Sequence, residues 1–244
     1  MALLQRSREL TFGLLALALA TQAAWAQPRR PLAENDIADI TRLVMLEDRR
    51  DFSENDLSRM LRSNHPEVRR RAAIAIARIG DARGRSLLHA ARADADTSVA
   101  ATIVFAVGQL KDSTAVPWLD TLLASPTEVT IGVEAARALG KIRTPEARVV
   151  LARFLASDDA SARPKPVIGE ALLAIGRNTT RGDLQPIVRW TTFSDEEMRW
   201  RATWALFRPR DPVAMPELLR LAEDQSAHVR SWAVRGLGVP QVDS

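Results

Sequence analysis

Apolar residues recur along this chain in a register that repeats about every 31 residues. Starting from six anchor residues, the positions four and eight residues later are apolar, and the position seven residues later is always small. This spacing forms one stripe of an α-helix, and the small residue beside it indicates that another helix approaches closely there. The anchors, from which we number positions in each unit, are Val68, Val99, Ile131, Val167, Met198 and Val229. The small residues at +7 are Ala75, Ala106, Ala138, Ala174, Ala205 and Gly236.

Shorter helical segments precede these second helices, for example residues 113–123, 145–155 and 212–221. Three such segments carry a proline, at Pro117, Pro186 and Pro216, which predicts a kink in the first helix. Each unit is therefore expected to be a kinked helix, a turn and a straighter helix. One hairpin cannot bury its apolar stripe alone, so the units must stack. The sequence predicts an all-α solenoid of about six helical hairpins over residues 52–238.

Two regions depart from the regular pattern. The segment SDDASARPKPVIGE (157–170) adds residues and two prolines before the fourth anchor, which predicts a wider gap or a change of curvature there. Residues 34–50 carry Ile37, Ile40, Val44 and Leu46 at helical spacing and predict a helix that caps the N-terminal end. We therefore divide the chain into a linker and capping helix (27–51), a repeat domain (52–238) and a tail (239–244).

The units resemble a known repeat family. The segments NHPEVRRRAAIAIARIGD (64–81) and SAHVRSWAVRGLG (226–238) are similar to HEAT repeats, and most similar to the short HEAT-like repeats of phycobilisome bilin lyases. The resemblance implies a right-handed, armadillo-type superhelix in which the second helices line the concave side. It also implies that this surface binds another protein.

The first 26 residues have a different composition. Arg6 and Arg8 precede an apolar run over residues 10–20, which is about half the length that spans a bilayer. Ala24 and Ala26 flank Trp25 in the small-x-small pattern of a signal-peptidase site. The sequence predicts a signal peptide (1–26), no transmembrane segment after its cleavage, and an exported protein that is periplasmic or secreted.

Composition narrows the chemistry. The chain of 244 residues has no cysteine, which excludes disulfides, thiolate metal sites and a cysteine nucleophile. Its three histidines, of which His65 and His228 are expected to be solvated in turns, match no catalytic or metal-binding spacing. The net charge is +4, and nearly all of the positive charge is arginine. This is weak support for a nucleic-acid partner, and export argues against one. We expect no enzyme activity, no cofactor and no metal.

Candidate binding residues lie on the exposed face of the second helices, which is expected to line the concave side, mainly at +3, +6 and +10. There the sequence mixes tryptophan, phenylalanine and basic residues, a composition typical of protein interfaces. In the alternative interpretation, Trp200, Trp204 and Trp232 fill space between the last two units. The candidates are Arg71, Arg78, Phe105, Gln109, Arg137, Lys141, Arg177, Trp200, Arg201, Trp204, Arg208, Trp232 and Arg235.

Arginine at +1 is expected to have a structural role instead. Arg69, Arg199 and Arg230 occupy this position in three units, off the core stripe. We expect them to pair with turn carboxylates of neighbouring units, such as Asp81, Asp112 or Asp211. The run Arg69-Arg70-Arg71 is then mostly the solvated face of a repeat.

Three functions remain open on the sequence. The first is an exported, non-catalytic scaffold that binds a protein on its concave face. The second is the repeat region of a cell-envelope prolyl isomerase, because LVMLEDRRDF (43–52) followed by HEAT-like units resembles the N-terminal half of exported bacterial cyclophilin-type isomerases. The third is polyanion binding through the basic +10 positions. The last unit lacks a polar terminal cap, which leaves self-association through it open as well.

Overall fold

The computed structural model describes residues 30–124, 128–178 and 183–238. The predicted signal peptide, with Ala24 and Ala26, and the tail (239–244) lie outside these ranges. Internal contacts divide the chain into residues 1–37 and residues 38–244. In the described part of the first unit, the Ala33 backbone N–H donates to Asp36 Oδ2 at 2.9 Å, where the first helix begins. The second unit holds the repeats.

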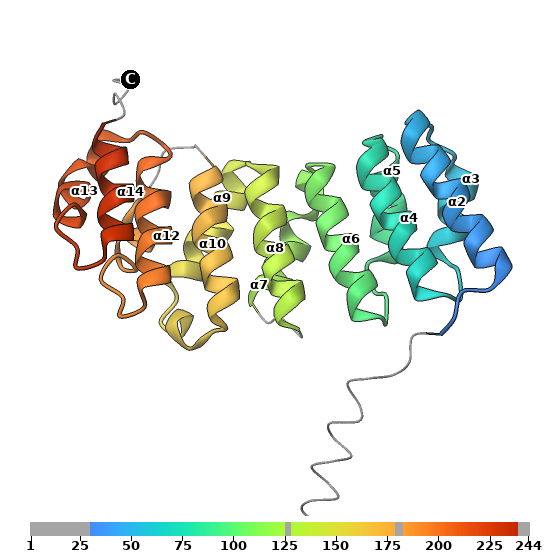
Figure 1. The fold of residues 1–244 in the computed structure, drawn as a ribbon, viewed down its shortest axis with the longest axis horizontal. Helices are drawn as coiled ribbons and strands as arrows, with labels where there is room; N and C mark the ends of the chain where they lie inside the picture. The colour runs from blue at the N-terminus through green and yellow to red at the C-terminus, as the bar shows by residue number, and fades with distance from the viewer. Residues whose placement is uncertain (1–29, 125–127, 179–182, 239–244) are drawn as a thin grey trace, which may run out of the picture. The chain divides into compact units, whose positions relative to one another are not determined.

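The described residues contain helices and no strand (Figure 1). They form the six predicted hairpins after one N-terminal helix, so the predicted all-α solenoid is confirmed. The helices are α2 (Glu34–Arg49), α3 (Glu54–Leu61), α4 (Pro66–Ile79), α5 (Gly84–Ala91), α6 (Thr97–Gln109), η1 (Ser113–Ala115), α7 (Val116–Ala124), α8 (Val129–Ile142), α9 (Pro145–Ala156), η2 (Ala160–Ala162), α10 (Lys165–Arg177), α11 (Gln185–Val188), α12 (Glu196–Phe207), η3 (Pro212–Ala214), α13 (Met215–Leu221) and α14 (Ala227–Leu237).

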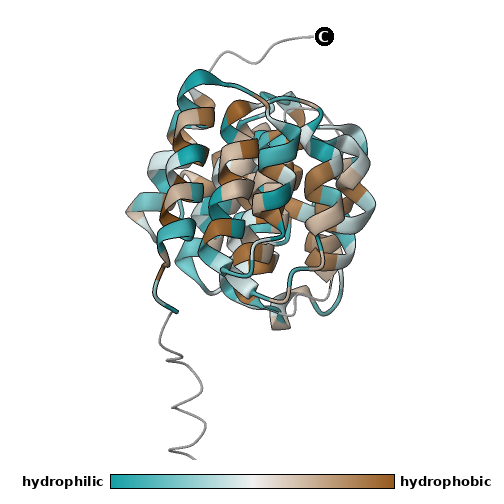
Figure 2. Ribbon diagram, turned by 90° about the vertical axis from the view of Figure 1, so that its right-hand side faces the viewer, coloured by the Kyte–Doolittle hydropathy of each residue, from teal (hydrophilic) through white to brown (hydrophobic). Residues whose placement is uncertain are grey.

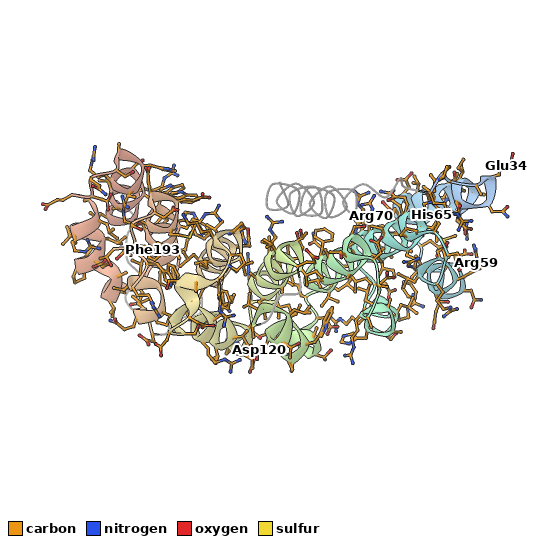
Figure 3. All side chains as sticks on the ribbon, turned by 90° about the horizontal axis from the view of Figure 1, so that it is seen from below. Glu34, Arg59, His65, Arg70, Asp120 and Phe193 are labelled. Carbon is orange, nitrogen blue, oxygen red and sulfur yellow. The ribbon has the colours of Figure 1, made fainter. Side chains whose placement is uncertain are left out.

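The helices of residues 38–238 form two layers. The second helices α4, α6, α8, α10, α12 and α14 each pack on the next one along the chain, and α3 packs on α5 and α7 on α9 in the other layer. In Figure 3 these residues form an arc with the second helices on its inner side and Asp120 of α7 on its outer side. Apolar and polar residues alternate along each helix (Figure 2), so each has one face toward the core and one toward solvent.

Helices α4, α6, α12 and α14 begin at side-chain caps that stand three residues before the anchors, whereas Glu128 and Pro164 at the same position before α8 and α10 make no such bond. Asp96 accepts hydrogen bonds from the backbone N–H groups of Ser98 and Val99, and Asp195 caps α12 in the same way. Such caps satisfy backbone donors that have no partner inside the helix. His65 also acts as a cap, since its Nδ1 accepts from the Glu67 N–H at 3.2 Å, and it is 5% exposed. The expectation that His65 is solvated is therefore wrong.

The predicted apolar stripe is the core. The six anchors and the six residues at +4 are buried. The small residues at +7 are buried too. From the third unit on, the structure shows why they must be small: each lies against position +9 of the preceding second helix. A Cβ atom added at Gly108 would lie 2.7 Å from Ala138 Cα, and one at Gly140 would lie 2.8 Å from Ala174 Cα. The backbones of adjacent units touch with no side chain between them.

The last interface reverses this arrangement. Position +9 of the fifth unit is Phe207, and position +7 of the sixth is Gly236. A Cβ atom at Gly236 would lie 2.7 Å from Phe207 Cβ. The large residue at +9 is therefore matched by glycine at +7 of the next unit, and the two helices still pack closely.

The fourth unit is more regular than the sequence predicts. Its extra residues fold into the short helix η2, and Arg163 beyond it donates to the Ala124 carbonyl at 2.6 Å. Helix α10 still packs directly on α8 through Ala174 and Gly140. The predicted wider gap at this unit is wrong, because α10 keeps its backbone contact with α8 while the inserted residues fold into η2, whose Ala160 is buried in the core.

The N-terminal helix and the prolines also differ in detail from expectation. Helix α2 forms as predicted, but Leu43 and Leu46 are its buried residues, whereas Val44 is 39% exposed. The buried stripe of α2 therefore contains Leu43 in place of the predicted Val44. Pro117 and Pro216 are the second residues of α7 and α13, each of which follows a 3-10 turn. The predicted kink is therefore the junction between a 3-10 and an α-helix.

Arginine at +1 joins one unit to the next at Arg69 and Arg199, whereas Arg230 donates to the Asp224 and Gln225 carbonyl oxygens in the turn before its own helix. Arg69 binds Asp94 through Nε at 2.7 Å and Nη2 at 2.9 Å, and Arg199 binds Asp224 at 3.1 and 3.2 Å. Each aspartate lies five residues before the anchor of the following unit. The structural role is as predicted, but the predicted partners Asp81, Asp112 and Asp211 are wrong.

The Asp224 carboxyl depends on this pairing for its charge. Burial acts to raise the pKa of Asp224, but hydrogen bonds from Arg199 and from the Ser226 backbone N–H outweigh burial and hold the pKa below its ordinary value. Both side chains of the pair are nearly buried, at 6% exposure for Arg199 and 8% for Asp224.

Replacing Gly140 with alanine tests the contact between units. We expect Gly140→Ala to lower the free energy of unfolding by about 1–3 kcal/mol, because the added methyl group meets backbone of α10, although alanine favours the helix. Urea denaturation followed by circular dichroism measures the change. The control is Gly238→Ala, where the nearest atom to an added Cβ lies at 3.6 Å. Equal stability of Gly140→Ala and the wild type would contradict the assigned contact.

Replacing Asp224 with asparagine tests the link between the fifth and sixth units. We expect a loss of about 3 kcal/mol at neutral pH, because Arg199 is left without its carboxylate. The folded pKa of Asp224 is lowered, so its contribution is complete above about pH 4 and is lost as the pH falls further. The difference between wild type and variant should therefore shrink on acidification. Asp120→Asn, at an ion pair whose arginine is largely exposed, should change stability by less than about 1 kcal/mol.

Candidate partner-binding surface

The structure places the candidate residues on one surface, which we call the second-helix face. It consists of the described side chains at +2, +3, +6 and +10 of the units that contain α4, α6, α8, α10, α12 and α14. None of the thirteen candidates is fully buried. The exposed candidates are Arg78, Gln109, Arg137, Arg208 and Arg235. The half-buried candidates are Arg71, Phe105, Lys141, Arg177, Trp200, Arg201, Trp204 and Trp232.

At the N-terminal end, the basic candidates are already paired. Glu47 of α2 forms ion pairs with Arg71 at 3.5 Å and with Arg78 at 2.6 Å, and its own side chain is 7% exposed. Arg70 pairs with Glu67 at 2.6 Å, and Arg69 pairs with Asp94. The run of three arginines is therefore neutralised within the fold. Sequence analysis missed Glu47, because it lies outside the repeat register.

The middle of the face has a second carboxylate cluster. Glu170, 5% exposed, binds Arg177 at 2.6 Å and Arg137 of the preceding unit at 3.2 Å. Arg137 also pairs with Glu134 on its own helix at 2.7 Å. These ion pairs bridge α8 and α10, so Arg137 and Arg177 hold the solenoid together and are not free for a partner.

Three basic candidates differ from these. Among the described residues, no carboxylate forms an ion pair with Lys141, Arg208 or Arg235. Each instead lies over an aromatic ring: Lys141 Nζ is 4.5 Å from the Phe105 centroid, Arg208 Cζ is 5.3 Å from Trp204, and Arg235 Cζ is 5.2 Å from Trp232. Such cation–π contacts contribute about 0.5–1 kcal/mol at exposed sites. They fix the position of each charge without neutralising it.

Lys141 carries its charge against a solvation cost. Burial lowers the pKa of Lys141; Glu134 opposes this shift, whereas Arg137 and Arg177 reinforce it. Burial therefore outweighs the carboxylates around this ammonium group.

The C-terminal aromatic residues form a stacked cluster. The Trp200 ring lies 5.1 Å from His228 and 6.3 Å from Trp232, and Phe207 lies 5.9 Å from Trp232, with interplanar angles of 20–24°. Trp232 Nε1 donates to His228 Nε2 at 3.0 Å. Trp200 and Trp232 thus fill the space between α12 and α14, as the alternative interpretation expected, while each keeps an accessible edge.

Trp204 and Arg201 pack toward the preceding unit instead. A Cβ atom at Gly176 would lie 2.7 Å from Trp204 Cζ3, and one at Gly169 would lie 2.9 Å from Arg201 Nη1. Arg201 also pairs with Glu197. Both side chains therefore lie flat on α10, where glycine leaves room for them. These glycines were not among the predicted small positions, because Gly169 and Gly176 lie at +2 and +9 and the regular small residue is at +7.

Other chemistry on the described residues is sparse. His89 Nε2 lies 2.7 Å from Asp112 Oδ2, but the same buried carboxylate also caps η1 through Thr114. In the described ranges no group of three His, Asp or Glu side chains is arranged to hold a metal. No helix within those ranges is long and apolar enough to cross a membrane.

The repeat geometry and comparison with known proteins define the class of this chain. It is an all-α solenoid of the HEAT and armadillo type. A family model described as HEAT repeats matches residues 84–168. No curated protein matches the chain in sequence.

Three solved structures share the fold. An engineered protein is 24% identical, with a TM-score of 0.52 over 74% of this chain and 93% of that chain. The CpcE–CpcF complex of phycocyanin lyase from Nostoc sp. PCC7120 is 19% identical, with a TM-score of 0.56 over 77% of each chain. A designed armadillo repeat protein in complex with the peptide (KR)4 is 20% identical, with a TM-score of 0.52 over 76% of this chain and 98% of that chain. At these identities the similarity establishes the fold alone.

Replacing Trp200 with alanine tests the space-filling role of the aromatic cluster. We expect Trp200→Ala to weaken the last unit by about 2 kcal/mol, because the stacked rings of α14 lose their support on α12. Hydrogen exchange of the α14 amides measures this locally, and about thirtyfold faster exchange is expected. Val234→Ala on the same helix, at a side chain that is 57% exposed, is the control. Unchanged α14 protection in Trp200→Ala would contradict the role.

Proposed function

We propose that this protein is an exported, non-catalytic scaffold that binds another protein on its second-helix face. HEAT-repeat solenoids are generally protein-binding scaffolds, which supports the coarse assignment. The observation that supports the second-helix face as the binding surface is the set of three cations held over aromatic rings without a carboxylate. Aromatic and arginine side chains that stay partly accessible are the usual anchors of protein interfaces.

Two solved relatives support a role in binding. The phycocyanin lyase is a complex of two chains, and the designed armadillo protein holds a peptide. Export rests on the predicted signal peptide and cleavage site at residues 1–26. The predicted absence of catalysis rests on the missing catalytic motifs in the sequence.

Photo-crosslinking in cells tests the proposed surface. A photoreactive amino acid replaces Gln109 on the second-helix face, and in a matched variant it replaces Val149 on α9, which is 61% exposed in the other layer. We expect a defined crosslinked protein from the Gln109 site and none at the Val149 site.

The crosslink should also depend on the C-terminal part of the same face. Adding Trp204→Ala, Arg201→Ala and Arg208→Ala to the Gln109 variant should reduce its yield by about tenfold. An equal yield with and without these substitutions would move the binding surface elsewhere. Crosslinking at both sites to the same extent would exclude a specific face.

A further inference from the structure

We propose that the second-helix face from α8 to α14 binds an extended acidic segment of the partner protein, whose carboxylates pair with Lys141, Arg208 and Arg235. This inference deepens the proposed function and rests on it. It commits to the charge and the conformation of the bound segment, which the repeat fold alone does not determine.

The face is strongly unbalanced in charge. At +3, +6 and +10 the described second helices carry eight basic side chains and two acidic ones. The acidic pair, Glu134 and Glu170, is held by Arg137 and Arg177. Beside these positions, Glu47 pairs with Arg71 and Arg78, and Glu197 pairs with Arg201. The basic side chains are Arg71, Arg78, Arg137, Lys141, Arg177, Arg201, Arg208 and Arg235. The face therefore presents unneutralised positive charge at its surface, concentrated in the three cations without ion pairs.

Each of these cations is pre-positioned for a carboxylate. A ring on one side restrains the side chain, so less conformational entropy is lost when a ligand binds. The outward N–H donors remain available, and hydrogen bonds between charged groups are the strong ones in proteins. A carboxylate on Lys141 would also offset the desolvation that lowers the pKa of that ammonium group.

The spacing of the cations fits an extended chain. Lys141 is on α8, and Arg208 directly follows the last residue of α12, two helices further along the stack. Packed helices lie about 8–10 Å apart, so the two charges are roughly 18 Å apart along the stack. An extended peptide advances about 3.3 Å per residue. Carboxylates five or six residues apart would therefore reach both cations.

The aromatic rings favour a peptide over a single-stranded nucleic acid. Nucleic-acid binding by such a face uses open aromatic surfaces on which bases stack. Here Trp204 is covered by Arg208 and packs on Gly176, and Trp232 lies between Phe207, His228 and Arg235. These rings are occupied by cations and by neighbouring side chains instead of standing open to bases.

Fluorescence anisotropy on the full mature chain tests the inference with defined probes. The first is a labelled octapeptide of alternating Asp and Glu; the second is its charge-reversed counterpart of alternating Lys and Arg; the third is an oligonucleotide of equal negative charge. The binding variant is Lys141→Gln, Arg208→Gln and Arg235→Gln. The matched control is Lys111→Gln, Arg62→Gln and Arg92→Gln, which removes the same charges from exposed turn positions.

We expect the acidic peptide to bind the wild type and the control equally, and the binding variant at least about tenfold more weakly. Preference for the basic peptide would overturn the inference. So would an oligonucleotide that binds as tightly as the acidic peptide, since the ligand class would then be a polyanion. Absence of acidic-peptide binding while the Gln109 crosslink persists would overturn the inference and leave the proposed scaffold function standing.

Discussion

The solenoid depends on one repeated contact, in which the backbones of consecutive second helices from α6 to α12 touch. Glycine at Gly108, Gly140 and Gly176 meets alanine at +7 of the following unit, with no room for an additional methyl group. Close packing of this kind leaves each unit a single position relative to its neighbour. This contact sets the spacing of the side chains on the second-helix face, including the separation of the three cations without ion pairs.

Charge is distributed according to the same geometry. Arginine at +1 reaches a turn carboxylate of the next unit, as at Arg69 and Arg199, while Glu47 and Glu170 neutralise arginines on the second-helix face. The arginines in these ion pairs therefore stabilise the stack. The net charge of the sequence is therefore a poor guide to a binding surface, and the cations that the fold leaves without ion pairs are a better one.

The sequence predicted the architecture because a helical repeat is a local pattern: anchors, caps and small residues can be read in one dimension. It predicted which side chains share a face for the same reason. It could not predict which of them are neutralised, since Glu47 reaches Arg78 across 31 positions and from outside the repeat. The true partners of the +1 arginines, Asp94 and Asp224, were missed because the sequence does not show which turn lies beside which helix.

The pairing of residue sizes at these contacts limits how the array can be rearranged. Units two to four present glycine at +9 and accept alanine at +7, so each has the same upper and lower surfaces. The fifth unit presents Phe207, which requires Gly236 in its follower. At this contact, a copy of an internal unit inserted between the second and fourth units would meet the same pair of small residues, whereas Phe207 and Gly236 of the last two units match only each other. The array is thus modular in its middle and fixed in order at its C-terminal end.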